Sequence, residues 1–201
     1  MIAICPKCGS HNWNKKVEGD VITCPNCGEK WRFIKKPLYI LTGCSGVGKT
    51  TTGMALQKLT TDFVVLDADM FFNIMPHETD EDYFAQVEQV QSLSKNIMQS
   101  GKCVVWTMAG NIDKLVRTYH AAFFSEIHVL ALVCSEESLR ERMTVGRGIT
   151  HEGWINGSVD YNHYFRTHEK IGDVAFETLD TDGKCVSQVA EEVLQWLKSK
   201  G

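Results

Sequence analysis

One eight-residue segment constrains the fold of this 201-residue chain more than any other. Residues 43–50 read GCSGVGKT, which matches the pattern GxxxxGK[ST]. The apolar run 38–42 comes directly before it, and a helix is expected after it, with Met54, Ala55 and Leu59 on the apolar face. A buried strand, a glycine-rich loop and a helix in this order predict the start of a parallel α/β sheet.

The residue types of this loop predict contact with phosphate. Glycines let successive backbone amides turn toward phosphate oxygens, and the helix N-terminus adds a partial positive charge. Lys49 is expected to span the β- and γ-phosphates of ATP, and Thr50 to ligate Mg²⁺. The residues predicted to contact the nucleotide are Gly43, Ser45, Gly46, Val47, Gly48, Lys49, Thr50 and Thr51.

The rest of the chain alternates apolar runs with helical patterns, of which the longest covers 80–100. The further expected strands are 64–69, 103–107, 127–133 and 175–179. Five strands alternating with helices predict a doubly wound parallel sheet that is covered on both faces. Lys36-Pro37 is the expected boundary between a small N-terminal domain, 1–36, and an α/β domain, 37–201.

The N-terminal segment holds two nearly identical turns, CPKCG at 5–9 and CPNCG at 24–28. A CxxC turn brings two thiolates to one ion, and the glycine after it permits a tight backbone, so the two turns together predict a tetrahedral Zn²⁺ site. The predicted zinc ligands are Cys5, Cys8, Cys24 and Cys27. The segment between the turns reads as a β-hairpin, and the whole resembles a zinc ribbon. Its role stays open between a structural staple, a docking surface for a protein, and contact with nucleic acid.

Charge and hydropathy narrow the class of protein. The chain has 21 Lys and Arg against 25 Asp and Glu, yet residues 1–36 hold seven basic and three acidic residues. Zinc-bound thiolates would halve that local excess, so the basic arm is a weak argument for nucleic acid. No stretch reaches the roughly 20 apolar residues of a membrane span, and no signal-peptide layout opens the chain. The expectation is a cytoplasmic protein without a membrane partner.

The second expected strand of the α/β domain ends in two acids, Asp67 and Asp69. Parallel sheets bind ligands at the carboxyl ends of their strands, so these carboxylates should face the phosphates. A glycine-rich phosphate loop followed by a strand ending in DxD resembles the nucleoside monophosphate kinase-like group, which includes shikimate and gluconate kinases. The resemblance covers roughly 38–200. It implies that Asp67 organises Mg²⁺ through water and that Asp69 holds or deprotonates an acceptor hydroxyl, whereas Asp69 as a simple helix cap is the alternative.

The third expected strand, 103–107, departs from many proteins with this loop because no acid follows it. The missing acid argues against a motor or switch ATPase. The turn after this strand is similar to the acid-free turn of shikimate kinase. Gly110 and Asn111 would line an acceptor pocket, although Asn111 could equally cap a helix.

Arginines cluster after the fourth expected strand. Kinases of the group that this chain resembles carry arginines at this point on a mobile lid, which is expected here at about 144–160. Gly146 and Gly148 flank Arg147 with flexible residues, which suits a moving segment. Arg147 first and Arg142 second are predicted to neutralise the transferring phosphoryl group, whereas Arg140 is expected to be a surface charge.

The resemblance implies an ATP-dependent kinase that phosphorylates a small molecule. Aromatic and amide residues at 150–168 favour a nucleoside or nucleotide as the acceptor, although the same residues could equally pack the lid. Two alternatives stay open: a 5′-hydroxyl polynucleotide kinase that docks its substrate through the zinc ribbon, and a non-catalytic ATP-binding regulatory module.

Overall fold

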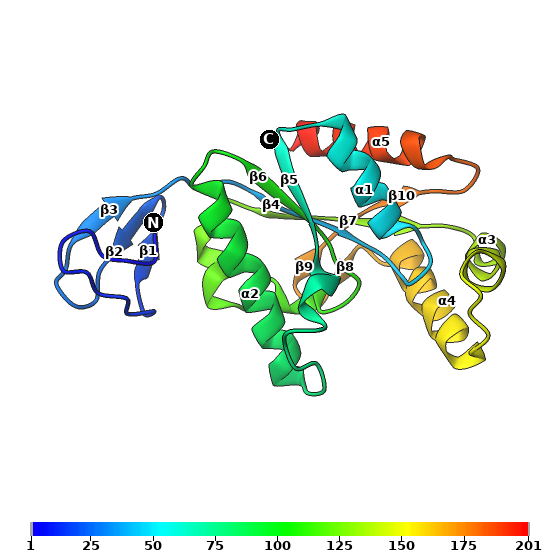
Figure 1. Cartoon of the computed structure of the whole chain (residues 1–201), viewed down its shortest axis with the longest axis horizontal. Helices are drawn as coiled ribbons and strands as arrows, with labels where there is room; N and C mark the ends of the chain where they lie inside the picture. The colour runs from blue at the N-terminus through cyan, green and yellow to red at the C-terminus, as the bar shows by residue number, and fades with distance from the viewer. Residues whose placement is uncertain (1, 201) are drawn as a thin grey trace.

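The central element of the fold is a five-stranded parallel sheet in the order β5-β6-β4-β7-β10 (Figure 1). The computed structural model describes residues 2–200, so the outermost residues of the two predicted domains, 1 and 201, lie outside it. The strands are β4 Leu38–Thr42, β5 Phe63–Asp67, β6 Cys103–Thr107, β7 Ile127–Val133 and β10 Glu177–Asp180. The predicted α/β class with a five-stranded parallel sheet is confirmed.

Helices cover both faces of the sheet (Figure 1). They are α1 Lys49–Leu59, α2 Asp80–Met98, α3 Glu136–Glu141, α4 Glu152–Thr167 and α5 Val186–Ser199. Leu38 and Ile40 of β4 pack toward α2, whereas Tyr39 and Leu41 pack toward α1 and α5. Because β4 is buried on both faces, its sequence is an unbroken apolar run.

Short helices shape the ends of the strands and the surface loops. They are η1 Ala68–Phe71, η2 Ile112–Lys114, η3 Tyr119–Phe123 and the π-helix η4 Arg142–Gly146. Among residues 2–200, none of the helices has both the length and the apolar composition that a membrane crossing needs.

The apolar face predicted for α1 is wrong in two of its three positions. Met54 is 59% exposed and Leu59 is 42% exposed, whereas Gly53 and Leu56 are buried. A Cβ at Gly53 would lie 2.8 Å from the Thr107 methyl carbon on β6. Close contact between helix and sheet at this glycine decides which side of α1 faces inward, and hydrophobicity alone does not reveal it.

The last strand of the sheet is shorter and lies later than expected. Ala175 belongs to β9, Val174–Ala175, which pairs antiparallel with β8, Lys170–Ile171. Gly172 turns this hairpin with a φ of 57°. The predicted run 175–179 therefore divides between the hairpin and β10.

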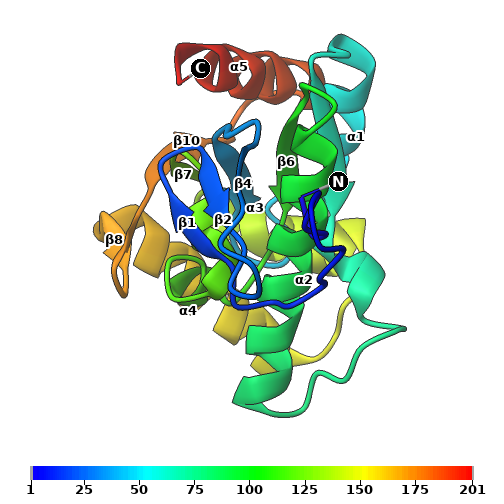
Figure 2. The ribbon, with the colours of Figure 1, turned by 90° about the vertical axis from the view of Figure 1, so that its left-hand side faces the viewer.

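The N-terminal segment forms a separate three-stranded antiparallel sheet beside α2 (Figures 1 and 2). Its strands are β1 Lys16–Glu18, β2 Val21–Thr23 and β3 Lys30–Arg32. Its small core contains Ile2, Ile22 and Phe33, and Phe123 of η3 completes that core. The boundary predicted at residue 36 lies between β3 and β4, and the division into two domains stays a prediction.

Candidate active site and metal centre

The loop between β4 and α1 has a backbone that only glycine tolerates at three positions. Gly43, Gly46 and Gly48 have φ angles of 134°, 84° and 108°. A Cβ at Gly43 would lie 2.5 Å from the carbonyl oxygen of Leu132, and one at Gly46 would lie 2.7 Å from Cγ of Met143. These close approaches leave no room for a side chain at Gly43 or Gly46, whereas at Gly48 the backbone conformation alone requires glycine.

The loop ends at the N-terminus of α1, where Gly48 caps the helix without a side chain. The first amides of α1 are therefore available to an anion, and the helix dipole favours one there. The ammonium of Lys49 lies over the same loop and donates to the carbonyl oxygens of Gly43 (2.9 Å) and Cys44 (2.8 Å). Burial lowers the pKa of Lys49, and an arriving phosphate would favour its charged form.

Two carboxylates at the end of β5 face this lysine. Asp67 caps η1 by accepting a hydrogen bond from the backbone amide of Asp69, at 3.0 Å. The cap is thus Asp67, and the Asp69 side chain takes no hydrogen bond from residues 2–200. Burial raises the pKa of Asp69 and the charge of Asp67 adds to the effect, whereas Lys49 and Arg147 lower it. The charges of Asp67, Lys49 and Arg147 therefore all act on the Asp69 carboxylate.

A magnesium ion is implied by this type of loop, and the oxygen atoms at the site suit it. Thr107 is the register partner of Asp67 on the neighbouring strand β6. The Thr107 hydroxyl is buried and has no hydrogen-bond partner in the part of the chain that the structure describes. A buried hydroxyl without a partner is costly unless a water or an ion's hydration shell satisfies it. Hydroxyl and carboxylate oxygens of this kind are the ligands that Mg²⁺ prefers, and Thr50 and Asp67 as its holders stay a prediction.

Arg147 reaches the loop from the segment that follows η4. Its Nη1 donates to the Ser45 hydroxyl at 2.9 Å, and its guanidinium carbon lies 5.6 Å from the ring centroid of Trp154. Trp154 is 48% exposed, so this pair borders the surface of the site. A guanidinium held there can meet a phosphate bound in the loop.

The other two arginines have different surroundings. Arg142 donates to the Val47 carbonyl oxygen at 3.2 Å and to the Thr181 hydroxyl at 2.9 Å, which ties the loop to the segment after β10. Its predicted contact with the transferring phosphoryl group stays a prediction. Arg140 pairs with the exposed Glu136 at 2.7 Å and lies on the surface.

Asn111 lies at the carboxyl end of β6, on the same edge of the sheet as Asp67. It is the one non-glycine residue with a positive φ, 62°, among the described residues, and its side chain makes no capping hydrogen bond. A side chain held in this conformation at the edge where ligands bind is a candidate for contact with an acceptor.

Asn162, one of the amides at 150–168 that the sequence analysis considered for acceptor contact, is buried and instead forms a polar clamp on α4. The amide side chain of Asn162 accepts from the Cys134 amide (3.2 Å) and donates to the Cys134 carbonyl oxygen (2.7 Å). Arg166 donates to the same carbonyl oxygen at 2.9 Å. These contacts fix the second half of α4 to the end of β7. An asparagine inside a helix usually reads as surface, so no sequence signal marks this one.

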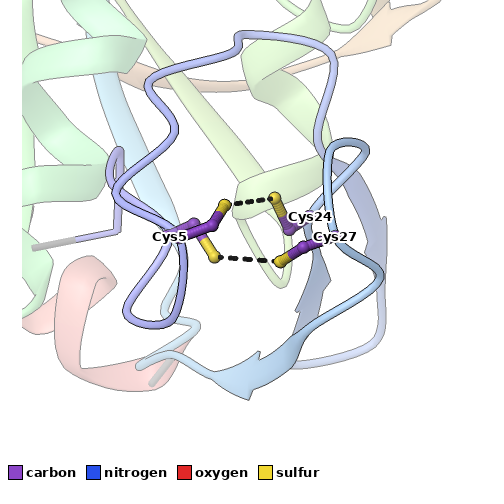
Figure 3. A group of neighbouring side chains, drawn as sticks. Cys5, Cys24 and Cys27 are labelled. Atoms are coloured by element: carbon purple, nitrogen blue, oxygen red, sulfur yellow. Dashed lines mark hydrogen bonds between the residues drawn. The ribbon is translucent and has the colours of Figure 1, made fainter.

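The four N-terminal cysteines meet at the tip of the small sheet (Figure 3). All four sulfur atoms lie within 4.8 Å of one another. The Cys5–Cys27 and Cys8–Cys24 sulfur pairs are each 3.7 Å apart. A tetrahedral zinc site with Zn–S bonds of about 2.3 Å has sulfur–sulfur edges of about 3.8 Å. The donor set and its spacing therefore fit Zn²⁺.

The two cysteine turns have the same backbone hydrogen bonds. The Gly9 amide donates to the Cys5 carbonyl oxygen and the Gly28 amide to that of Cys24, both at 3.0 Å. Gly9 and Gly28 have φ angles of 68° and 72°. The glycine after each CxxC pair thus serves the tight turn that the sequence predicted.

The central parallel sheet, the glycine-rich loop on its middle strand and the facing carboxylates define a P-loop protein of the α/β nucleotide-binding class. The AAA domain family matches residues 40–161, and the chain belongs to this family. No curated protein matches the chain.

Solved structures with the same fold include three kinases. A sugar kinase from Janibacter sp. HTCC2649 is 19% identical, with a TM-score of 0.59 over 82% of this chain and 95% of that one. A gluconokinase from Sinorhizobium meliloti 1021 is 18% identical, with a TM-score of 0.55 over 84% and 94%. A shikimate kinase from Acinetobacter baumannii, in complex with shikimate, is 20% identical, with a TM-score of 0.52 over 84% and 96%. The predicted resemblance to the fold of P-loop small-molecule kinases is confirmed.

Proposed function

We propose that the chain is an ATP-dependent phosphotransferase that transfers the γ-phosphoryl group to a hydroxyl or phosphate of a small molecule. The observation that carries this proposal is that Lys49 and Arg147 both contact the glycine-rich loop, close enough to the carboxylate of Asp69 for their charges to lower its pKa. The cations suit the phosphates of a donor, and the carboxylate suits the proton of an acceptor. The three similar structures are kinases of small molecules by their descriptions, which supports the proposal.

The proposed mechanism is mainly positional and electrostatic. The loop amides and Lys49 hold the β- and γ-phosphates, and Arg147 moves from Ser45 onto the transferring group. Asp69 accepts the proton of the acceptor hydroxyl as its oxygen attacks the γ-phosphorus, and the bond to the β-phosphate oxygen breaks. Thr50 and Asp67 would hold Mg²⁺, which neutralises charge on the phosphates when it is bound.

We propose a nucleoside or nucleotide as the acceptor. Exposed apolar side chains follow Asp69 directly, namely Met70, Phe72 and Ile74 at 50%, 47% and 70% exposure. An aromatic base could cover this apolar surface and stack on Phe72. On this proposal the zinc ribbon has a structural role, and its four thiolates need a reducing compartment such as the cytoplasm.

A 5′-hydroxyl polynucleotide kinase is the second candidate. It is favoured by the position of the zinc ribbon beside α2, the helix that directly follows the acceptor-side segment 68–79 (Figure 1). A substrate longer than a mononucleotide could contact both the zinc ribbon and segment 68–79. This candidate predicts turnover with 5′-hydroxyl oligonucleotides that weakens steeply with added salt.

Acceptor screening by coupled ADP release tests the proposal. The panel contains nucleosides, nucleotides, sugar acids, shikimate and 5′-hydroxyl oligonucleotides, and Lys49→Ala serves as the blank. The expected result is acceptor-dependent ADP release that Lys49→Ala abolishes. Nucleotide binding without acceptor-dependent release across the panel would instead favour a regulatory module.

A further inference from the structure

The zinc ribbon and the α/β domain enclose a small cavity between them. Its volume is about 100 Å³, and its lining includes Ile2, Trp13, Lys15, Lys95, Tyr119 and Phe123. The N-terminal segment that contributes part of this lining passes beside α2 (Figure 2), and its Ile2 shares a core with Phe123 of η3. The cavity is separate from the glycine-rich loop, and nothing in the proposed phosphotransfer uses it.

Two lysines line this cavity, one from each domain, and both are almost fully buried. Lys15 is 5% exposed and Lys95 is 4% exposed. Each ammonium has three donors. In the described chain the Lys15 ammonium donates to the Asn12 carbonyl oxygen, and the Lys95 ammonium donates to Nδ1 of His120 at 2.9 Å. The Lys95 ammonium also lies 4.3 Å from the ring centroid of Phe123 and 5.8 Å from that of Trp13, which stabilises part of its charge. No further hydrogen-bond acceptor for either ammonium lies in the described chain, so the remaining donors are left for a ligand.

Buried lysines normally pair with a carboxylate, and another lysine of this chain does so. Lys114 is 7% exposed, and its ammonium lies 2.8 Å from a carboxylate oxygen of Asp80 and 3.7 Å from one of Asp113. Within residues 2–200, no carboxylate oxygen lies within 4.0 Å of the Lys15 or Lys95 ammonium. Two buried positive charges in one cavity without an adjacent acid are unfavourable unless an anion joins them.

Glu88 lies beside the cavity, where it accepts from the Tyr119 backbone amide at 2.9 Å and faces the His120 ring, and its charge partly offsets the lowering of the Lys95 pKa. Burial lowers the pKa of His120 to about 4, so the ring is neutral near pH 7. Its Nδ1 accepts from Lys95, which leaves the proton on Nε2, 3.4 Å from a carboxylate oxygen of Glu88. Burial and the charge of Lys15 lower the pKa of Lys95 to about 8, so this lysine is still mostly charged near pH 7. The cavity therefore keeps an excess of positive charge.

We propose that this cavity binds a phosphate-type oxyanion between Lys15 and Lys95, as free phosphate or as the phosphate of a mononucleotide. One water needs about 10–15 Å³ of such space, so a group of several heavy atoms fits. The oxygens of phosphate would accept from both ammonium groups in charge-assisted hydrogen bonds. Because the lysines come from different domains, the bound anion would hold the ribbon against α2.

Isothermal titration of the full, zinc-loaded chain with inorganic phosphate tests the proposal. Saturating Mg-ADP occupies the glycine-rich loop throughout, and ionic strength is held constant with chloride. Lys15→Met and Lys95→Met should each weaken phosphate binding about tenfold or more, because each removes one charge-assisted contact. Lys16→Met is the matched control, since the neighbouring Lys16 side chain is 70% exposed and pairs with Glu18. The control should bind like the wild type.

Two results would overturn the proposal: no saturable binding at millimolar phosphate, or equal affinity in Lys15→Met, Lys95→Met and Lys16→Met. A parallel titration with AMP distinguishes the sources, and Lys95-dependent binding of either ligand supports the site. If Lys15→Met and Lys95→Met both fail to fold, the unfolding temperature of the wild-type protein tests the proposal. Phosphate must then raise its unfolding temperature above that in chloride at equal ionic strength, and an unchanged temperature refutes the site.

Discussion

Replacing Asp69 with asparagine separates a catalytic base from a structural acid. The substitution keeps the size of the side chain, which is exposed, and removes a charge that partial desolvation and the charge of Asp67 disfavour. General bases contribute about 10²–10⁴-fold, so kcat should fall by that factor, which equals about 3–5 kcal/mol of transition-state stabilisation. The affinity for ATP should stay the same, because Lys49 and the loop amides bind the phosphates.

The same substitution should have the opposite effect on stability. The folded-state pKa of Asp69 is raised, so its ionised form is disfavoured by folding at every pH above the ordinary pKa of the group. Asp69→Asn removes this unfavourable charge and should raise the unfolding temperature near pH 7. Below the ordinary pKa of an aspartate the two proteins should converge, because Asp69 is then protonated in both states.

The pH dependence of turnover gives a third readout. Asp69 must be ionised to accept a proton, so kcat/KM of the wild type should fall as pH falls through the raised pKa. This acid limb should lie above the range of an ordinary aspartate and should be absent in Asp69→Asn. Coupled ADP release across pH and thermal unfolding measure these effects. Asp62→Asn, an exposed acid before β5, is the control. Wild-type turnover in Asp69→Asn, or a joint loss of activity and stability, would refute the assignment.

Three further perturbations test the loop, the clamp on α4 and the metal centre. Gly46→Ala should cost about 1–2 kcal/mol of strain at its positive φ and weaken ATP binding, measured by titration, about tenfold. Gly157→Ala lies inside α4 with open space around it and should leave ATP binding unchanged. Equal ATP affinities of the two variants would contradict the loop geometry. Asn162→Ala should lower the free energy of unfolding by about 1–3 kcal/mol in denaturant titrations, because the buried Cys134 amide loses its partner. The exposed Asn156→Ala should change it little, and similar values for both would exclude the clamp. Chelation of zinc should lower the unfolding temperature, and added Zn²⁺ should restore it; an unchanged temperature in protein shown to be metal-free would exclude a stabilising ion.

Local patterns in the sequence were enough to predict the loop, the cysteine turns and the sheet. The glycines at 43, 46 and 48 and those after each CxxC pair are needed for a backbone conformation, which is a property of a few consecutive residues. Apolar runs indicated the five strands, because a parallel strand that is buried on both faces contains few polar residues. The run at 175–179 was assigned to one strand because periodicity cannot show the break at β9.

Tertiary contacts decided the features that join distant segments. The inward face of α1 depends on Gly53 meeting Thr107, and the fixing of α4 depends on Asn162 meeting Cys134. Phe123 completes the core of a ribbon that lies far from it in sequence.

The two buried lysines are the clearest case. Lys15 lies between β1 and the first cysteine turn, and Lys95 lies on α2, so in the sequence each reads as a solvated surface charge. Only the packing of the ribbon against α2 removes both from water and places them in one cavity. Short-range sequence specifies the local conformations and the types of ligand atom. The fold decided which charges are desolvated together, because burial and proximity are properties of the packed chain.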